Sequence, residues 1–428
     1  MYFAVIIVYF LELILHLCMT DLRFKSLYLK HASITGFRSI SDMEIVLEKG
    51  LNILIGKNGS GKSNLLFILK EVLRYNGLPQ DTHLKAISFM MSTYNDEDTF
   101  EVKYERKQSI DDNFESNYAP KFYFRRSYRF NGNDLIMNIR RGIGTKTYNE
   151  EDGSFIQPRN LSYNYALRKY NILFPNTILL GYHLPQSIEF IETAGKFILD
   201  YDLFESRFND SLTFINRLLW KLENELFNYF NQIIEDELEA EKIASIDPNY
   251  IRSFFVIDEN LIESLSKYTP IKNIRYNSNI NIYYDGLQII IENIKIDFFV
   301  NDTWLPWSHL SDGTKRLFYI VSEIHNMDEG IVLLEEPELG IHPHQFHLLM
   351  QFIKERSEDN QIILSTHSPL ALNHLDSHEL YRILIASYTK NTGTQIRQLS
   401  IEEQAKANSY VDEVGYLSDY WVHSDLEE

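Results

Sequence analysis

The sequence predicts an α/β fold, in which a phosphate-loop (P-loop) sheet flanked by helices carries an antiparallel β-lobe and a helical insertion. Three observations predict this fold. A glycine-rich phosphate-binding motif stands between a short buried strand and a helix, and a second buried strand far downstream ends in acids. Between them, short β-type runs give way to helical spacing. The 428 residues, 44% hydrophobic and 24% charged, have the composition of an ordinary globular protein.

The first regular elements surround the phosphate-binding motif. Alternation of apolar and polar residues predicts strands at Ser26–Ile34 and Met43–Leu47. Leu51–Ile55 is a short run of the buried-strand type, and Asn64–Arg74 has helical spacing with a broad apolar face. We therefore expect a strand, a loop and a helix in this order.

The middle of the chain changes character twice. Short β-type runs with polar turns from about Phe89 to Ile143 predict the antiparallel lobe, and Leu203–Ala244 returns to helical period. Three further strands are then predicted at Ile280–Tyr284, Leu287–Ile291 and Ile294–Val300. We expect four regions: an apolar leader (1–19), the N-terminal half of the sheet domain with the β-lobe (20–200), a helical insertion (201–275) and the C-terminal half (276–428).

The leader, residues 1–19, is mostly apolar and leaves two interpretations open. Its length is close to that of a membrane span, but Glu12 and His16 interrupt it and no basic residue precedes it. Alternatively, the natural protein begins at Met19, which leads directly into the first strand pattern. We favour the second interpretation and do not expect a membrane partner.

Net charge and cysteine content limit the classes of partner. The formal charge of −19 repels a phosphate backbone, so any contact with DNA must be local. A basic stretch with interleaved aromatic residues is the best candidate for such contact, although we favour an antiparallel hairpin with one buried aromatic face as its explanation: Lys121, Phe122, Tyr123, Phe124, Arg125, Arg126, Tyr128, Arg129, Phe130, Arg140, Arg141 and Lys146. The single cysteine, Cys18, fits a reducing cytoplasm.

The phosphate-binding motif matches the pattern G-x-x-x-x-G-K-[ST] and is followed by an asparagine. Its residues are Gly56, Lys57, Asn58, Gly59, Ser60, Gly61, Lys62, Ser63 and Asn64. Glycines allow backbone N–H groups to surround phosphates at a helix N-terminus. Lys62 suits the β- and γ-phosphates, and the Ser63 hydroxyl suits Mg²⁺. The motif therefore predicts ATP and Mg²⁺ as ligands.

Acidic residues follow the buried run Ile331–Leu334. Glu335 and Glu336 stand at the end of this predicted strand, where one carboxylate can hold a metal and the next can orient or deprotonate water. We assign Glu335 to Mg²⁺ and Glu336 to the attacking water. Glu335 replaces the aspartate that is more usual at this position and reaches one methylene further.

Leu310-Ser311-Asp312-Gly313-Thr314-Lys315-Arg316, ahead of a helical run, resembles the ABC signature in the variant found in RecF- and SMC-like ATPases. That resemblance implies that Ser311 and Gly313 grip the γ-phosphate bound to the opposite subunit. After the strand Gln361–Ser365, His367 resembles the switch histidine of the same group. The run from Ile34 to Ser39 and the run from Glu336 to Pro343 also match, the latter especially the OLD-type and anti-phage defence ATPases.

The resemblance covers residues 20–75 and 300–376 and implies an ATPase that dimerises around ATP. The Toprim nuclease domain of OLD proteins is not expected, because the chain after Leu370 is too short for it and has no Asp-x-Asp. A separate protein effector in anti-phage defence is the favoured partner, and a DNA-binding role in repair is the alternative. The glutamine of the family's Q-loop is left open between Gln157 and Gln186.

Overall fold

Strand β3 (Leu51–Ile55) of the computed structural model is an interior strand of the main sheet and lies at the position that the sequence predicts. All five residues are buried, because β18 (Gln361–Thr366) and β19 (Ile383–Thr389) pair with β3 on its two edges, both in parallel. Strands that are covered on both faces take continuous apolar runs, which explains the Leu and Ile content of β3 and β18.

The chain forms two compact units. The first comprises residues up to Leu179, Glu329–Leu333 and the residues from Asp359 onward; the second comprises Leu180–Asp328 and Leu334–Glu358. The structure describes residues 25–73, 83–108, 122–135, 147–148, 155–156, 167, 170, 172, 174–181, 195–200, 244–253, 255–286, 288–424 and 426. The leader, Gln157, Gln186 and the predicted helical run before Ala244 lie outside the described residues.

A mixed sheet of 12 strands contains β3, in the order β10-β17-β18-β3-β19-β20-β2-β1-β4-β5-β6-β7. The other bounds are β10 (Thr177–Leu180), β17 (Ile331–Glu335), β20 (Gly393–Gln398), β2 (Ile40–Val46), β1 (Leu27–Phe37), β4 (Ala86–Thr93), β5 (Thr99–Gln108), β6 (Phe122–Phe130) and β7 (Asn133–Leu135). The predicted antiparallel lobe is therefore the continuation of the P-loop sheet, joined to it through β1 and β4. The α/β fold class is confirmed.

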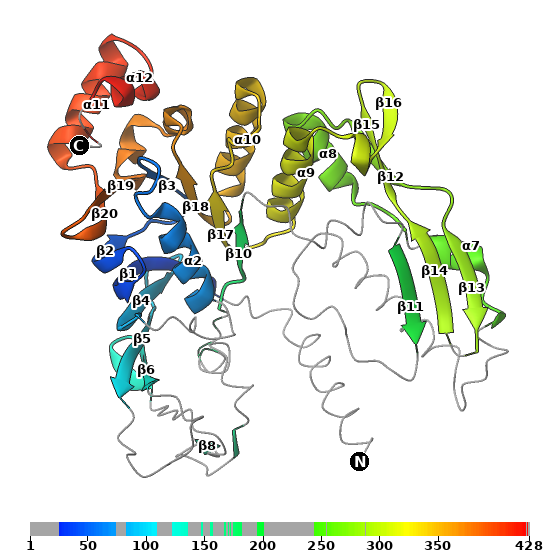
Figure 1. The fold of residues 1–428 in the computed structure, drawn as a ribbon, viewed down its shortest axis with the longest axis horizontal. Helices are drawn as coiled ribbons and strands as arrows, with labels where there is room; N and C mark the ends of the chain where they lie inside the picture. Colours follow the sequence, from blue (N-terminus) through cyan, green and yellow to red (C-terminus); the bar gives the residue numbers. More distant parts are fainter. Residues whose placement is uncertain are drawn as a thin grey trace. The chain divides into compact units, whose positions relative to one another are not determined.

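Helix α2 (Lys62–Leu73) lies against this sheet (Figure 1). Its buried residues include Leu65, Leu66 and Leu69, which belong to the same apolar cluster as Leu54 of β3. The helix begins two residues before the predicted start, because Lys62 and Ser63 of the phosphate loop form its first turn.

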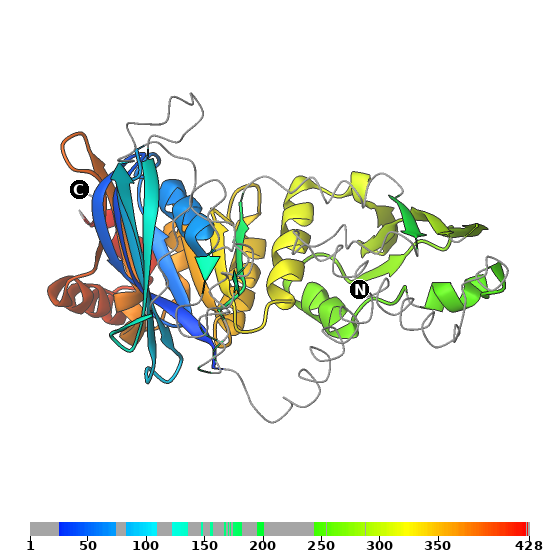
Figure 2. The same ribbon diagram turned by 90° about the horizontal axis from the view of Figure 1, so that it is seen from below.

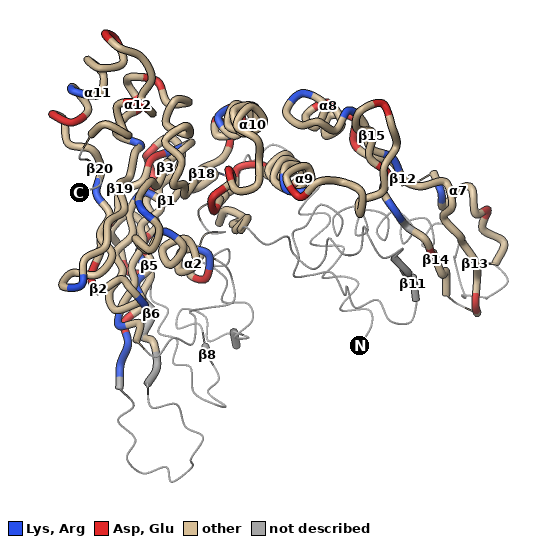
Figure 3. The backbone as a smooth tube through the Cα atoms, turned by 45° about the horizontal axis from the view of Figure 1, so that its top comes forward, with Lys and Arg blue, Asp and Glu red and all other residues tan. Residues whose placement is uncertain are grey.

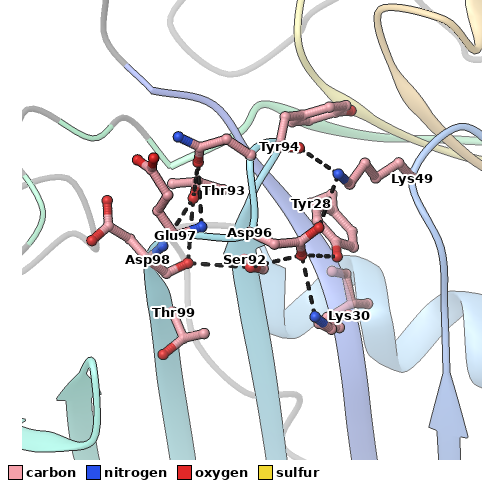
Figure 4. Close-up of polar contacts among 12 residues, drawn as sticks. Tyr28, Lys30, Lys49, Ser92, Thr93, Tyr94, Asp96, Glu97, Asp98 and Thr99 are labelled. Carbon is pink, nitrogen blue, oxygen red and sulfur yellow. Dashed lines mark hydrogen bonds and ion pairs between the residues drawn. The ribbon is translucent and has the colours of Figure 1, made fainter.

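The β4–β5 turn is tied to β1 by a polar network centred on Asp96 (Figure 4). The Asp96 carboxylate accepts hydrogen bonds from the Tyr28 hydroxyl at 2.7 Å and from Ser92 at 3.2 Å. It also pairs with Lys30 at 3.2 Å and with Lys49, two residues before β3, at 2.9 Å. The Tyr28 hydrogen bond and the lysines hold the pKa of Asp96 well below its usual range. These contacts tie the antiparallel strands to the residues that lead into the phosphate loop.

Helices α11 (Ile401–Glu413) and α12 (Leu417–His423) follow β20 and end the described chain. They come after two short 3₁₀ helices, η5 (Pro369–His374) and η6 (Ser377–Arg382). Ser400 caps α11 by accepting from the Glu403 N–H, while Glu403 accepts from the Ser400 N–H.

The second unit combines small antiparallel sheets with four helices among its described residues (Figure 2). Its strands are β11 (Gly195–Asp200), β12 (Asn273–Tyr276), β13 (Asn281–Asp285), β14 (Gln288–Ile294), β15 (Ile296–Val300) and β16 (Thr303–Pro306). Its helices are α7 (Pro248–Ser253), α8 (Glu259–Tyr268), α9 (Asp312–His325) and α10 (Pro343–Arg356), with η4 (Trp307–His309) ahead of α9. Phe298, Trp307 and Phe318 pack edge to face or tilted around the base of α9. A two-stranded sheet, β8 (Thr147–Tyr148) with β9 (Phe155–Ile156), completes the first unit.

Among the described residues, no helix is both long and apolar enough to cross a bilayer.

Candidate nucleotide-binding site

The phosphate loop joins β3 to α2 and requires glycine at several positions. Gly59 and Gly61 have φ angles of +80° and +97°, in the left-handed region that L side chains rarely adopt. A Cβ on Gly61 would stand 2.0 Å from the Thr394 Oγ1, and a Cβ on Gly56 would stand 2.2 Å from the carbonyl oxygen of Ala386. The backbone of the loop can take this path only because these positions carry no side chain.

The polar groups of the loop fit a phosphate ligand. Lys62 is only 4% exposed, and its Nζ donates to the carbonyl oxygens of Gly56, at 2.7 Å, and Lys57, at 3.2 Å. The Ser60 hydroxyl is buried and, among the described residues, has no hydrogen-bond partner. Ser63 and Asn58 are exposed. A loop that holds a buried ammonium and an unpaired buried hydroxyl has donors to offer to phosphate oxygens.

Asn64 of the motif is supported by three residues that the sequence did not identify as part of the site: Arg38, Ser39 and Thr394. The Asn64 Nδ2 donates to the Ser39 hydroxyl at 2.7 Å, and the Thr394 hydroxyl donates to the same oxygen at 2.8 Å. Arg38 donates to the Asn64 Oδ1 at 3.2 Å, and its guanidinium lies 4.4 Å from the ring centre of Phe67. Arg38 and Ser39 belong to the run from Ile34 to Ser39 that resembles the ATPase group, but their role as a support depends on the pairing of β2 with β20.

His367 lies at the same edge of the sheet as the phosphate loop. In the parallel pairing of β18 with β3, Thr366 is opposite Ile55, so the next residues along the two strands are His367 and Gly56. Thr366 is buried and its hydroxyl accepts from the Ser368 N–H at 2.9 Å, whereas His367 is exposed. The predicted switch histidine and the loop therefore lie together within the first unit.

The signature motif belongs to the second unit, where Ser311 is the N-cap of α9. Its hydroxyl accepts from the Thr314 N–H at 3.2 Å, and the residue is exposed. Gly313 packs so closely against the 338–341 turn that a Cβ would stand 2.5 Å from the carbonyl oxygen of Gly340. The helix N-terminus thus presents N–H groups that suit an anion.

The two acids are also described within the second unit, and Arg316 of α9 holds their backbone. The Arg316 Nη2 donates to the carbonyl oxygens of Glu335, at 2.9 Å, and Glu336, at 2.8 Å, and the side chain is 5% exposed. Glu336 has a φ angle of +43°, which is strained for a residue with a side chain. The Glu335 carboxylate lies beside Gly181, with Oε2 3.6 Å from the position of a Cβ there. The signature helix and the acids are therefore joined through one buried guanidinium.

The proposed metal ligands, Ser63 and Glu335, belong to the first and second unit respectively, and their joint use of Mg²⁺ stays a prediction. A different group, Asp376, His378 and Glu379, has its ligand atoms within 4.8 Å of one another. There, Asp376 and Glu379 form the capping box of η6, and Glu379 pairs with Arg382 at 3.6 Å. Helix capping accounts for that arrangement without a metal.

Only Arg129 of the basic residues in the predicted nucleic-acid stretch has a described side chain, and it pairs with Asp134 at 2.7 Å. Tyr128 and Phe130 are buried in the core, so they are not available to stack on bases. For these residues the hairpin with one buried aromatic face is the correct interpretation. Lys121, Arg140, Arg141 and Lys146 lie outside the described residues.

Known proteins resemble this chain along most of its length. It is 21% identical over 410 residues to the "Retron Vc95 probable ATPase" of Vibrio cholerae, a match that covers 85% of this chain and 76% of the relative. It is 23% identical over 370 residues to the "Septu protein PtuA" of Bacillus mycoides, covering 84% of this chain and 41% of that relative. An SMC head bound to the C-winged helix domain of ScpA aligns at 16% identity with a TM-score of 0.48, over 89% of this chain and 99% of the other.

The family model described as "AAA domain, putative AbiEii toxin, Type IV TA system" matches residues 51–373, from β3 with its phosphate loop to the residues just after His367. The chain belongs to this family.

Proposed function

We propose that the protein binds and hydrolyses ATP as a head-to-head dimer of the ABC and SMC type, and that this switch controls a separate protein effector in anti-phage defence in the cytoplasm. The observation that carries the proposal is the phosphate loop, in which glycine is required at Gly56 and Gly61 and Lys62 is held over the loop by its own carbonyls. One relative named as a probable ATPase and the family description of an AAA domain support the same function.

Each site residue has a task that its chemistry suits. The N–H groups from Asn58 to Asn64 surround the phosphates, and Lys62 exchanges its carbonyl partners for the β- and γ-phosphate oxygens. Ser63 and Glu335 would hold Mg²⁺, which would supply positive charge at those oxygens when bound. Glu336 accepts a proton or a hydrogen bond from the attacking water, and His367 donates to the γ-phosphate.

The signature is proposed to act on ATP held by the other subunit. Ser311 is exposed at the N-terminus of α9, where unpaired N–H groups and the helix dipole favour a phosphate. Arg316 couples that helix to the backbone of Glu335 and Glu336. A phosphate that docks on Ser311 and Gly313 would therefore act on the catalytic acids of the subunit that supplies the signature, which links the two sites of a dimer.

Two variants test the arrangement in trans. Lys62→Ala removes the phosphate cation, and Ser311→Asp keeps an N-cap acceptor but places a negative charge where the γ-phosphate would dock. In a head-to-head dimer each variant alone has no intact site, whereas a mixed dimer has one. We expect each variant to be inactive and an equimolar mixture to recover about a quarter of the wild-type ATPase rate, since about half of randomly formed dimers are mixed. An inactive mixture of correctly folded variants contradicts the action in trans.

DNA enters the same assay as the competing function. The ATPase rate is measured with and without double-stranded DNA at two salt concentrations, with Glu336→Gln as the blank. Turnover that depends on Glu336 and ignores DNA supports control of a protein effector. Stimulation by DNA that is lost at high salt supports a RecF- or SMC-like repair role.

A further inference from the structure

Exposed apolar side chains gather on the C-terminal helices α11 and α12. Val414 is 67% exposed and Tyr416 is 69% exposed, although both are large apolar residues. Val411 of α11 is 36% exposed and lies three residues before Val414, the residue that caps the end of this helix. We call the set Val411, Val414 and Tyr416 the α11–α12 patch.

The helix pair already has its own internal packing, which leaves the patch outside. Trp421 and Leu417 are each 5% exposed and pack inward. Asn373 of η5 and Ser418 of α12 exchange two hydrogen bonds: the Asn373 amide donates to the Ser418 hydroxyl at 3.0 Å, and the Ser418 N–H donates to the Asn373 Oδ1 at 2.9 Å. Tyr410 and Tyr420 bring the two helices together with ring centres 5.4 Å apart. The patch therefore lies on helices that are packed against each other and are hydrogen-bonded to η5.

Acidic residues outnumber basic ones along α11 and α12, where the tube in Figure 3 carries both red and blue stretches. Asp412, Glu413 and Asp419 lie within or next to the patch in sequence, and among the described residues no basic side chain lies within ion-pair distance of their carboxylates. The one lysine of these helices, Lys406, lies five residues before Val411, and its ammonium pairs with the Glu402 carboxylate at 2.8 Å. Apolar area with unpaired carboxylates around it is the pattern of a binding surface with a preferred sign of charge.

Charge decides among the classes of occupant. A nucleic acid would place phosphates against these carboxylates, and the same face of a second copy would place like charges together. A basic protein segment satisfies both the carboxylates and the apolar centre. We propose that the α11–α12 patch docks a basic segment of a separate protein chain, most simply an amphipathic helix whose apolar side chains cover Val414 and Tyr416. This names the chemistry of the effector partner and rests on the proposed control of an effector.

The test uses a fluorescein-labelled helical peptide of leucine and lysine as probe, with a peptide in which glutamate replaces lysine as its control. Anisotropy titrations compare the full chain with Val414→Ser/Tyr416→Ser, with Asp412→Asn/Glu413→Gln, and with Ile401→Ser. Ile401 is the matched control, because it is 87% exposed on the same helix but lies at its opposite end. None of these residues belongs to the nucleotide site. An unchanged ATPase rate therefore shows that a variant is folded, and the rate of the wild type tests the proposed function independently of peptide binding.

We expect the leucine–lysine peptide to bind the wild type, and each double variant at the patch to weaken binding about tenfold or more while Ile401→Ser leaves it unchanged. Equal binding to the wild type and the patch variants overturns the proposal, as does equal binding of the glutamate peptide. Self-association of the wild type that the patch variants abolish, measured by sedimentation, overturns the assignment of a separate chain. Normal ATPase turnover without peptide binding by the wild type means that the docking surface fails and the ATPase stands. Peptide binding without ATPase turnover means that the proposed ATPase fails and the docking surface stands.

Discussion

Replacing Arg316 with methionine should separate stability from catalysis at the second half of the site. The guanidinium donates two hydrogen bonds to backbone carbonyl oxygens, that of Glu335 at 2.9 Å and that of Glu336 at 2.8 Å, from a position that is 5% exposed. Hydrogen bonds to charged groups are each worth about 1.5–3 kcal/mol. Part of this gain is cancelled, because burying a guanidinium is itself costly and methionine fills a similar volume. We expect a net loss of about 1–3 kcal/mol in the free energy of unfolding.

The larger effect should fall on turnover. Glu336 has a left-handed backbone at φ +43°, a conformation that the two hydrogen bonds from Arg316 help to hold. Without them the strand end can relax and move the carboxylate from the water that it orients. A misplacement of this kind costs about ten- to a hundred-fold in kcat, or about 1.4–2.7 kcal/mol of the barrier.

Arg356 provides the matched control. Its Nη2 donates to the carbonyl oxygens of His325, at 3.3 Å, and Met327, at 2.8 Å, so Arg356→Met removes the same kind of contact away from the acids. Urea unfolding followed by circular dichroism gives the stability of both variants, and steady-state ATPase at a temperature where both are folded gives kcat. If Arg316→Met loses no more kcat than Arg356→Met, Arg316 supports the fold only and the coupling argument fails.

Two more predictions follow from the geometry. In Gly61→Ala the new Cβ would stand 2.0 Å from the Thr394 Oγ1, on a backbone with a left-handed φ of +97°. Nucleotide affinity should therefore fall more than about tenfold in a fluorescent-ATP titration. Gly132→Ala is the control, because it has a similar φ of +76° but no atom near its Cβ, and it should leave affinity unchanged. Burial, and then the positive charge of Arg356, lower the pKa of His325 below its ordinary value of 6.5. The unfolded chain therefore binds this proton more readily than the folded chain. Stability should be lost as the pH falls through 6.5 towards the lowered pKa. Urea midpoints should drop less from about pH 7 to about pH 5 in His325→Gln than in the wild type, and an equal drop would contradict this.

The predicted strands and the phosphate loop were accurate where a local pattern has one physical solution. Leu51–Ile55 was predicted as a buried strand, because four of its five residues are apolar and it leads into a loop that needs glycine at fixed positions. The β-lobe was predicted as antiparallel, but its union with the central sheet was not predictable, because that depends on the pairing of β1 with β4 over a long separation in sequence. Local alternation identifies strands and says nothing of which distant strand they pair with.

The same distinction holds for the site. Lys62, Ser311, Glu335, Glu336 and His367 stand in short motifs whose chemistry can be read directly from the sequence. The residues that hold them, such as Arg316, carry no such mark, because their partners are backbone carbonyls, which every residue has. An arginine at the last position of the signature run could equally have faced solvent. Its burial is decided by the packing of α9, so the coupling between signature and acids emerges only in three dimensions, and Arg316→Met tests the part of the mechanism that the motifs do not contain.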